Sequence, residues 1–168
     1  FPFLSRVGVM WQTGSINPAY EHFITNLIRQ KLFVAIDSQP KNLTPGAKRF
    51  LLFLPAHEPH EIGLLFANYL IRSRGHHSSY LGPNLPLDDL SPVMTIYKAD
   101  FMLTVLTTAI AAHSPLTIAN KLSKDFPQAN ILIGGGQILQ ANIHFPKNVR
   151  TLSTMQELIS LLDYIKAN

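Results

Sequence analysis

The spacing of apolar residues changes near residue 40 and divides the chain into two parts. Before this point apolar side chains recur every three to four residues, as they do on one face of an α-helix. They form two groups, namely Phe3, Leu4, Val7, Met10 and Trp11, then Tyr20, Phe23, Ile24, Leu27, Ile28, Leu32, Ala35 and Ile36. Asn17 and Pro18 are suited to the N-cap and first position of the second helix, and Pro40 marks its end. Residues 1–40 therefore predict a helical hairpin, which is part of a helical bundle.

After residue 40, short apolar runs alternate with helical patterns. The runs predict strands at 49–54, 77–81, 101–106, 130–133 and 149–151, and the helical patterns predict helices at 61–74, 87–99, 115–126 and 154–167. This alternation predicts an α/β domain over residues 41–168, with a doubly wound, parallel, five-stranded Rossmann-like sheet. Ligands of such sheets bind beyond the carboxyl ends of the strands. We therefore expect the site in the turns at 55–60, 82–86, 107–114 and 134–137.

Composition narrows the class of protein. Of 168 residues 46% are apolar and 14% are charged, against ~25% charged in an average soluble domain, so the chain can bury a sizeable core. No apolar run approaches the ~18 residues of a membrane span, so we expect a soluble protein with no membrane partner. Cysteine is absent, which excludes disulfides, thiolate zinc sites and thiol catalysis and favours the cytoplasm. The net charge is +4, but the basic residues are too scattered for a nucleic-acid-binding arm.

The expected turn at 55–60 contains the densest group of candidate ligands. His57-Glu58-Pro59-His60-Glu61 directly follows the first expected strand. A neutral imidazole is the commonest side-chain metal ligand, and a nearby carboxylate can fix its tautomer. Position alone leaves an equal alternative, two exposed histidines in a polar loop. A zinc hydrolase is disfavoured, because its helical His-Glu-x-x-His motif spaces the histidines four apart, whereas here the spacing is three and Pro59 intervenes.

Three short motifs along the chain together resemble the cobalamin-binding signature, Asp/Glu-x-His-x-x-Gly, then Ser/Thr-x-Leu, then Gly-Gly. The matching residues are Glu58, His60 and Gly63, then Thr104 and Leu106, then Gly134 and Gly135. No Gly-x-Gly-x-x-Gly motif follows the first expected strand and no P-loop lysine is present, which excludes dinucleotide and nucleoside-triphosphate sites of those kinds.

The resemblance implies roles for these residues. In cobalamin-binding domains of this kind, the histidine replaces the benzimidazole of the cofactor as the lower cobalt ligand, and the displaced nucleotide tail enters the domain. By resemblance, His60 is the metal ligand, Glu58 orients it, and Thr104 offers its hydroxyl to the tail. Glycines at positions 63, 134 and 135 suit such a tail, because they have no Cβ that would block its approach to the backbone.

A second pattern lies in the helical part of the chain. Trp11, nine further residues, then Glu21-His22 resembles the pattern of MerR-type light-responsive transcriptional regulators, the CarH and LitR group. In this group a helical bundle covers the upper face of the corrin, so the resemblance implies that these three residues bind the 5′-deoxyadenosyl group. A histidine follows the tryptophan in the best-known members, whereas this chain has Gln12, which puts a bis-histidine light product in doubt.

We therefore expect an adenosylcobalamin-binding, light-sensing regulatory domain without catalytic turnover. The chain begins at Phe1, and we expect it to be the sensory fragment of a longer protein, which contacts DNA through an upstream domain and forms a homo-oligomer. One alternative is the cobalamin-carrying unit of a methyltransferase or mutase, which shares the lower signature. Another is an interaction module that binds no cofactor.

Overall fold

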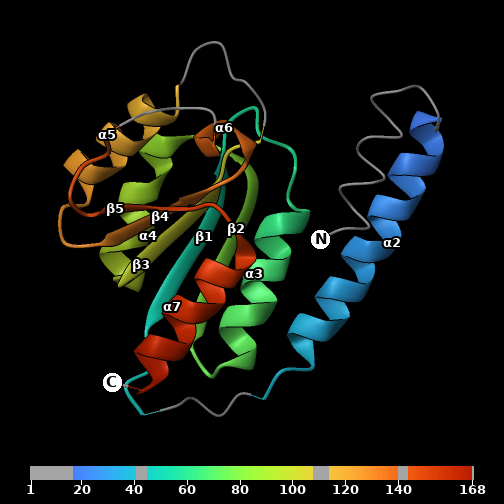
Figure 1. Ribbon diagram of the computed structural model, residues 1–168, viewed down its shortest axis with the longest axis horizontal. Helices are drawn as coiled ribbons and strands as arrows, with labels where there is room; N and C mark the ends of the chain where they lie inside the picture. Colours follow the sequence, from blue (N-terminus) through green and yellow to red (C-terminus); the bar gives the residue numbers. More distant parts are fainter. Residues whose placement is uncertain (1–16, 41–44, 108–113, 140–143, 168) are drawn as a thin grey trace.

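The computed structural model describes residues 17–40, 45–107, 114–139 and 144–167. The first helix of the expected hairpin, with Trp11 and Gln12, lies outside them. The second is confirmed as α2, Pro18–Asp37, and the side chain of Asn17 caps it by accepting the Ala19 N–H at 2.8 Å. The helix ends at Asp37, slightly before Pro40. Ile36 is buried, and α2 runs beside α3 on the outside of the α/β body (Figure 1).

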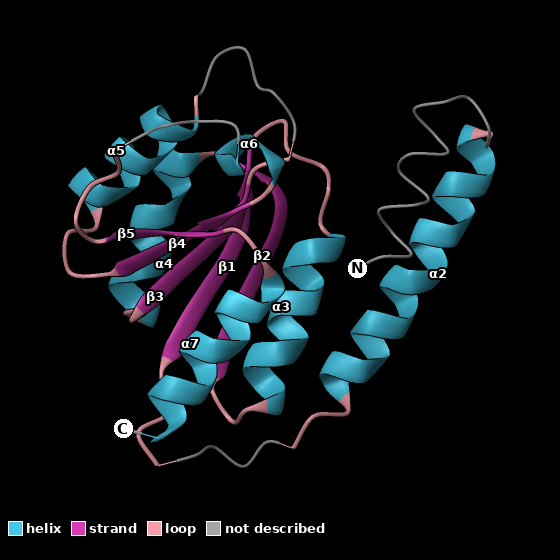
Figure 2. Cartoon of the chain, in the orientation of Figure 1, coloured by secondary structure: helices cyan, strands magenta, loops and turns pink. Residues whose placement is uncertain are grey.

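Five parallel strands form one sheet in the order β2-β1-β3-β4-β5. They are β1 Arg49–Pro55, β2 His77–Leu85, β3 Phe101–Val105, β4 Asn130–Gly134 and β5 Val149–Leu152 (Figure 2). The expected α/β, Rossmann-like fold is therefore confirmed. Because β2 and β3 lie on opposite sides of β1, the strand order reverses there, and the carboxyl ends of β1 and β3 form the switch point where such sheets bind ligands.

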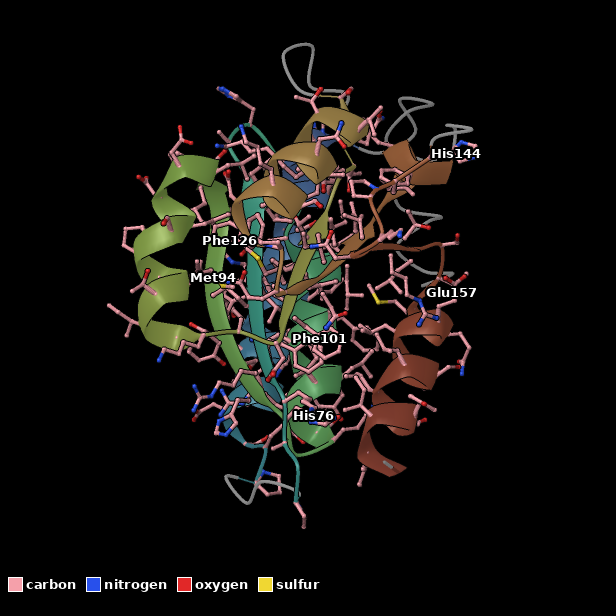
Figure 3. All side chains as sticks on the ribbon, turned by 90° about the vertical axis from the view of Figure 1, so that its left-hand side faces the viewer. His76, Met94, Phe101, Phe126, His144 and Glu157 are labelled. Atoms are coloured by element: carbon pink, nitrogen blue, oxygen red, sulfur yellow. The ribbon has the colours of Figure 1, made fainter. Side chains whose placement is uncertain are left out.

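Helices cover both faces of the sheet. They are α3 Ile62–Ser73, α4 Leu90–Tyr97 with the short 3₁₀ helix η1 Leu87–Asp89 before it, α5 Pro115–Asp125, α6 Gly136–Leu139 and α7 Met155–Ala167. α3 and α7 pack on one face, and α4 and α5 on the other. Figure 3 shows this division, with Met94 of α4 on one side of the sheet and Glu157 of α7 on the opposite side. In the part of the chain that the structure describes, no helix combines the length and apolarity needed to cross a membrane.

The core follows from the apolar run of β1. The run from Phe50 to Leu54 is fully buried, as expected for a parallel strand with helices on both faces. Successive side chains of a strand point to opposite faces, so Leu51 packs towards α4 and α5, and Leu52 packs towards α3 and α7. Phe50 also stacks on Phe101 of β3, with ring centroids 4.7 Å apart. The central strands therefore fix the frame on which the loops are built.

The expected boundaries of β2 and of the 82–86 turn were wrong. The strand continues to Leu85, and its pairing with β1 shifts register twice, between Leu52 and Phe53 and between Phe53 and Pro55. Gly82 and Asn84 within it have φ of 83° and 59°. Left-handed residues inside a strand produce a bulge that bends it without ending it. The bend brings Asn84 to the loop after β1.

Candidate functional site

The loop between β1 and α3 is held from the neighbouring strand. His57 has a φ of 69°, which is uncommon for a residue with a side chain. Its backbone N–H donates to Oδ1 of Asn84 at 3.1 Å. The bulge in β2 and the left-handed turn at His57 therefore set the path of the loop just before the expected metal ligand.

Glu58 is the centre of the site. Its side chain is fully buried, Oε1 lies 2.8 Å from Nδ1 of His60 and accepts the His60 backbone N–H at 3.2 Å, and Oε2 accepts the Thr107 N–H at 2.6 Å. A buried carboxylate needs such donors, since desolvation otherwise makes it very costly. Glu58 follows β1 and Thr107 follows β3, so the carboxylate joins the two loops at the switch point.

The contact with Glu58 orients the His60 imidazole. An ionised carboxylate only accepts hydrogen bonds, so Nδ1 donates and Nε2 becomes the nitrogen that would bind a metal. The His60 side chain is 59% exposed while its carboxylate partner is 0% exposed. The predicted pair is therefore present, with a buried carboxylate orienting a ring that solvent can reach.

The second and third motifs meet at the ends of β3 and β4. The N–H of Leu106 donates to the Gly134 carbonyl at 2.8 Å, and the Gly135 φ is 109°. A Cβ on Gly135 would lie 2.3 Å from the Leu106 carbonyl oxygen, so no other residue fits there without displacing the backbone. Gly63 lies elsewhere, with the Met155 methyl group 3.8 Å from the position of a Cβ. Met155 begins α7, so Gly63, in the first turn of α3, faces the start of α7.

Thr104 is separated from Gly63 by the sheet. It is 1% exposed, and its hydroxyl has no hydrogen-bond partner among the described residues. It pairs with Ile133, which packs in the cluster under α4 and α5. The structure therefore places the Thr104 hydroxyl towards α4 and α5, whereas Gly63 borders α7 on the other face.

The residues expected above the cofactor are only partly described, because Trp11 is outside the described range. Glu21 and His22 lie in the first turn of α2. Oε1 of Glu21 accepts the Thr25 hydroxyl at 2.9 Å, and Oε2 lies 3.8 Å from Nδ1 of His22, which is 76% exposed. They are adjacent near the start of α2, and their role towards a ligand stays a prediction.

Sequence reasoning assigned no role to the second carboxylate next to His60. Glu61 directly follows the ring and precedes α3, its side chain is 9% exposed, and Oε1 lies 2.7 Å from Nε of Arg29. The Tyr80 hydroxyl donates to Oε2. The pKa of Tyr80 is raised above its usual range, mainly by burial and secondly by this hydrogen bond to Glu61. The only signal in the sequence was the position of Glu61 beside a candidate ligand, since its partners lie on distant elements.

The described residues fit a cobalt ion that brings a macrocycle with it. No group of three or more His, Asp or Glu side chains in these ranges could hold a bare metal ion, but one imidazole suffices as the axial ligand of a macrocyclic metal. His60 is exposed and oriented for this role. The buried, unpartnered Thr104 hydroxyl offers a polar contact, and next to Gly63 only the flexible Met155 side chain occupies the space that a Cβ would reach.

Comparisons with known proteins give a relative by sequence and a shared fold. No protein-family model matches the chain. The chain is 31% identical over 101 residues to the HTH-type transcriptional repressor CarH of Myxococcus xanthus, a match that covers 60% of this chain and 33% of the repressor. The aligned region thus spans about a third of this relative.

Solved structures share the fold. The monomethylamine corrinoid protein of Methanosarcina barkeri has a TM-score of 0.73 and 12% identity, over 95% of this chain and 77% of that one. The methanol:cobalamin methyltransferase complex MtaBC of the same organism has a TM-score of 0.59 and 13% identity, over 96% and 64%. A cobalamin-binding protein of Desulfitobacterium hafniense has a TM-score of 0.53 and 13% identity, over 96% and 77%. The fold of this chain is that of corrinoid proteins.

Proposed function

We propose that this chain binds cobalamin, with Nε2 of His60 as the lower ligand of cobalt. The observation that carries the proposal is the buried Glu58 carboxylate, which orients His60 and joins the ends of β1 and β3 through Thr107. The sequence similarity to CarH and the fold shared with corrinoid proteins support it. Two separate features are available to the nucleotide tail, namely the space beside Gly63 on the face of α3 and α7, and the Thr104 hydroxyl on the face of α4 and α5.

The form of the cofactor in this proposal is adenosylcobalamin, and the role is light-dependent regulation of transcription without catalytic turnover. Its support is the Trp11, Glu21, His22 pattern together with the similarity to a transcriptional repressor. When bound, adenosylcobalamin supplies a cobalt–carbon bond that visible light cleaves. The chain itself would enclose the adenosyl group with α2, orient His60 from below, and act on DNA through another domain of a homo-oligomer.

A methyl-carrying role is the second candidate. Its support is the fold shared with the monomethylamine corrinoid protein and with a methyltransferase complex, each over most of this chain. The two functions differ in the upper ligand that they require. Equal affinities for adenosylcobalamin and methylcobalamin would favour the carrier, whereas a preference for the adenosyl form would favour the regulator.

The first experiment tests the lower ligand by absorption and by electron paramagnetic resonance of the cob(II)alamin complex. In the ¹⁵N-labelled parent protein we expect hyperfine splitting from a ¹⁵N imidazole, which differs from the splitting that the unlabelled benzimidazole of the cofactor gives. His60→Ala removes the ring, so this splitting should disappear and the affinity should fall. His57→Asn is the matched control, because it removes the neighbouring ring but tolerates the left-handed backbone at φ 69°. Unchanged spectra for His60→Ala would refute the assignment.

The second experiment tests the upper face. Glu21→Ala should reduce the preference for adenosylcobalamin over methylcobalamin, since a buried polar group left unpaired costs ~1–3 kcal/mol. Spectra and size-exclusion chromatography in the dark and after green light then test the switch. Gln12 is no strong cobalt ligand, so we expect water or a weak group above cobalt after illumination. An unchanged spectrum and oligomer under light would contradict the light-sensing role.

A further inference from the structure

Two carboxylates flank His60 and are attached to different parts of the molecule. Glu58, two residues before it, holds the loop to the end of β3 through the Thr107 N–H. Glu61, one residue after it, accepts a bond from the Tyr80 hydroxyl of β2 and pairs with Arg29 of α2 at 2.7 Å. The backbone joins Glu61 closely to the loop, because its N–H donates to the Pro59 carbonyl at 2.9 Å. One side of His60 is thus attached to the end of β3, and the other side to β2 and α2.

The contact with α2 is a compact cluster, formed by Arg29, Phe33, Glu61 and Tyr80. The Arg29 guanidinium lies 5.8 Å from the centroid of the Phe33 ring. The Phe33 ring meets the Tyr80 ring edge to face, with centroids 6.5 Å apart. Arg29 therefore contacts both a carboxylate and an aromatic ring, and Tyr80 closes the cluster from the sheet side.

The burial of Glu61 makes Arg29 the member that matters most. The Glu61 side chain is 9% exposed and that of Arg29 is 43% exposed. Removing the cation from such a pair leaves a buried charge without compensation, which is far more costly than losing an exposed ion pair. The Tyr80 hydroxyl remains as a donor to Glu61, but the compensating charge is present only while α2 holds the guanidinium against the carboxylate.

We infer that Arg29 is a positioning residue, which couples the placement of α2 to the loop that carries His60. A shift of α2 moves the guanidinium away from Glu61, and Glu61 is covalently attached to His60. Glu21 and His22 are on the same helix, about two turns before Arg29. A ligand that contacts them therefore affects the position of α2, and with it the position of the Arg29 guanidinium. The coupling itself is a property of the protein alone, and its effect on cobalt rests on the proposed function.

Hydrogen exchange of the cofactor-free chain tests the coupling. Arg29→Gln should speed amide exchange in α2 and in residues 57–61 by about 10-fold or more. The matched control is Arg74→Gln at the opposite end of α3, which breaks the Arg74–Asp163 ion pair of the same 2.7 Å length. This control should leave residues 57–61 unchanged. Equal effects of the two variants on this loop, or no effect of Arg29→Gln, would overturn the inference.

Two further variants separate coupling from general loss of stability. Glu61→Gln removes the charge that Arg29 compensates, so adding Arg29→Gln to it should change the loop much less than Arg29→Gln changes it in the parent. Arg29→Lys should restore part of the protection, because it keeps a cation at the same place. Additive effects in the double variant would overturn the inference, even if Arg29→Gln alone folds poorly.

Cob(II)alamin then shows whether the coupling reaches the cobalt ligand. In the ¹⁵N-labelled parent, ¹⁵N hyperfine splitting reports imidazole ligation by the protein, and its absence there would refute the proposed function while leaving the exchange result intact. If the parent shows this ligation, Arg29→Gln should lower the fraction of cobalt that is ligated by histidine. It should also weaken cobalamin affinity by roughly 10-fold, the lower end of the range for residues that orient a metal ligand. Arg74→Gln should retain the parent spectrum, and loss of ligation in both variants would overturn the positioning role.

Discussion

Left-handed backbone has different roles at the two ends of the parallel strands, which we call the amino edge and the carboxyl edge of the sheet. At the amino edge, Gly75 with φ 77° and Lys98 with φ 51° follow α3 and α4 and lead into the next strands. Such residues commonly end helices. At the carboxyl edge, His57 with φ 69°, Asn84 with φ 59° and Gly135 with φ 109° lie in loops or within a strand. Gly46, with φ 73°, lies in the turn before β1. At the amino edge this conformation thus occurs at two helix ends and in a turn, whereas at the carboxyl edge it shapes the candidate site.

The histidines at the two edges also have different roles, which follow from their burial and their hydrogen bonds. His76, at the amino edge in Figure 3, is 3% exposed, and its Nδ1 accepts the Lys48 N–H at 3.2 Å. An imidazole that accepts at Nδ1 cannot also be protonated there. His60 instead donates from Nδ1 to a buried carboxylate and exposes most of its ring. One ring is thus part of the packing, while the other is oriented by a carboxylate and open to solvent.

Gly135→Ala should give the largest effect at the carboxyl edge. The new Cβ would lie 2.3 Å from the Leu106 carbonyl oxygen at a φ of 109°, so overlap and backbone strain together should cost about 3 kcal/mol or more. Urea unfolding measures the loss. Gly136→Ala is the control, because nothing lies within 4 Å of its Cβ. Equal stability of the two variants would mean that Gly135 is not required.

Glu58→Gln should have the next largest effect. In the parent, both carboxylate oxygens of Glu58 accept hydrogen bonds, whereas the glutamine amide has only one acceptor oxygen. A buried hydrogen bond is therefore lost, at a cost of ~1–3 kcal/mol. Cobalamin affinity should fall ~10- to 100-fold. Glu157→Gln is the control, since Glu157 also accepts a backbone N–H, from Ser153 at 3.1 Å, but in an exposed position. Urea unfolding and cofactor titration give the two values, and similar losses in both variants would refute the central role of Glu58.

His76 should make stability depend on pH at the amino edge. Burial lowers its pKa from 6.5, and the charges of Lys166, Lys48 and Arg74 add to this, against the carbonyl of Leu162. Below pH 6.5 the unfolded chain therefore binds the proton more readily than the folded chain, so the unfolding free energy decreases as the pH falls. His76→Gln should flatten this dependence between pH 7 and the lowered pKa, whereas the exposed neighbour variant His77→Gln should retain it. Parallel urea titrations would show an identical slope in all three chains if the expectation is wrong.

The smallest effect is expected at Asn84. Asn84→Ala removes the acceptor of the His57 N–H and places alanine at a φ of 59°, so unfolding should become easier by about 1 kcal/mol. Asn84→Gly keeps the backbone conformation accessible and should recover the backbone part of this loss. Hydrogen exchange of the His57 amide should be faster in both variants. If glycine is worse than alanine, the left-handed backbone is not what asparagine provides.

The parts of the fold that depend on local periodicity could be predicted from the sequence. The apolar run of β1 and the capped start of α2 at Asn17 each carry their signal within a few neighbouring residues. The length of β2 could not be predicted, because Gly82 and Asn84 favour a turn, and only pairing with β1 keeps the strand extended. The short helix α6 was missed, since it begins at Gly136, the last glycine of the 134–136 run, and has only four residues.

In the candidate site, too, the contacts between residues close in sequence could be predicted, and those between distant elements could not. The spacing of Glu58 and His60 indicated a carboxylate that orients a ligand, and the structure has this contact. The donor from Thr107 is a backbone group, and backbone groups have no signature in a sequence. Arg29 and Tyr80 come to Glu61 from separate elements, so only the packing of α2 and β2 brings them together.

The bonds of Glu58 also determine what remains to be ordered when a ligand arrives. Fixing one residue of a mobile loop costs ~1–2 kcal/mol of conformational entropy. In this chain the carboxylate ties its own loop to His60 and to the end of β3 within the folded protein. A molecule that binds at this edge therefore meets a preorganised loop, so more of its contact free energy remains as affinity.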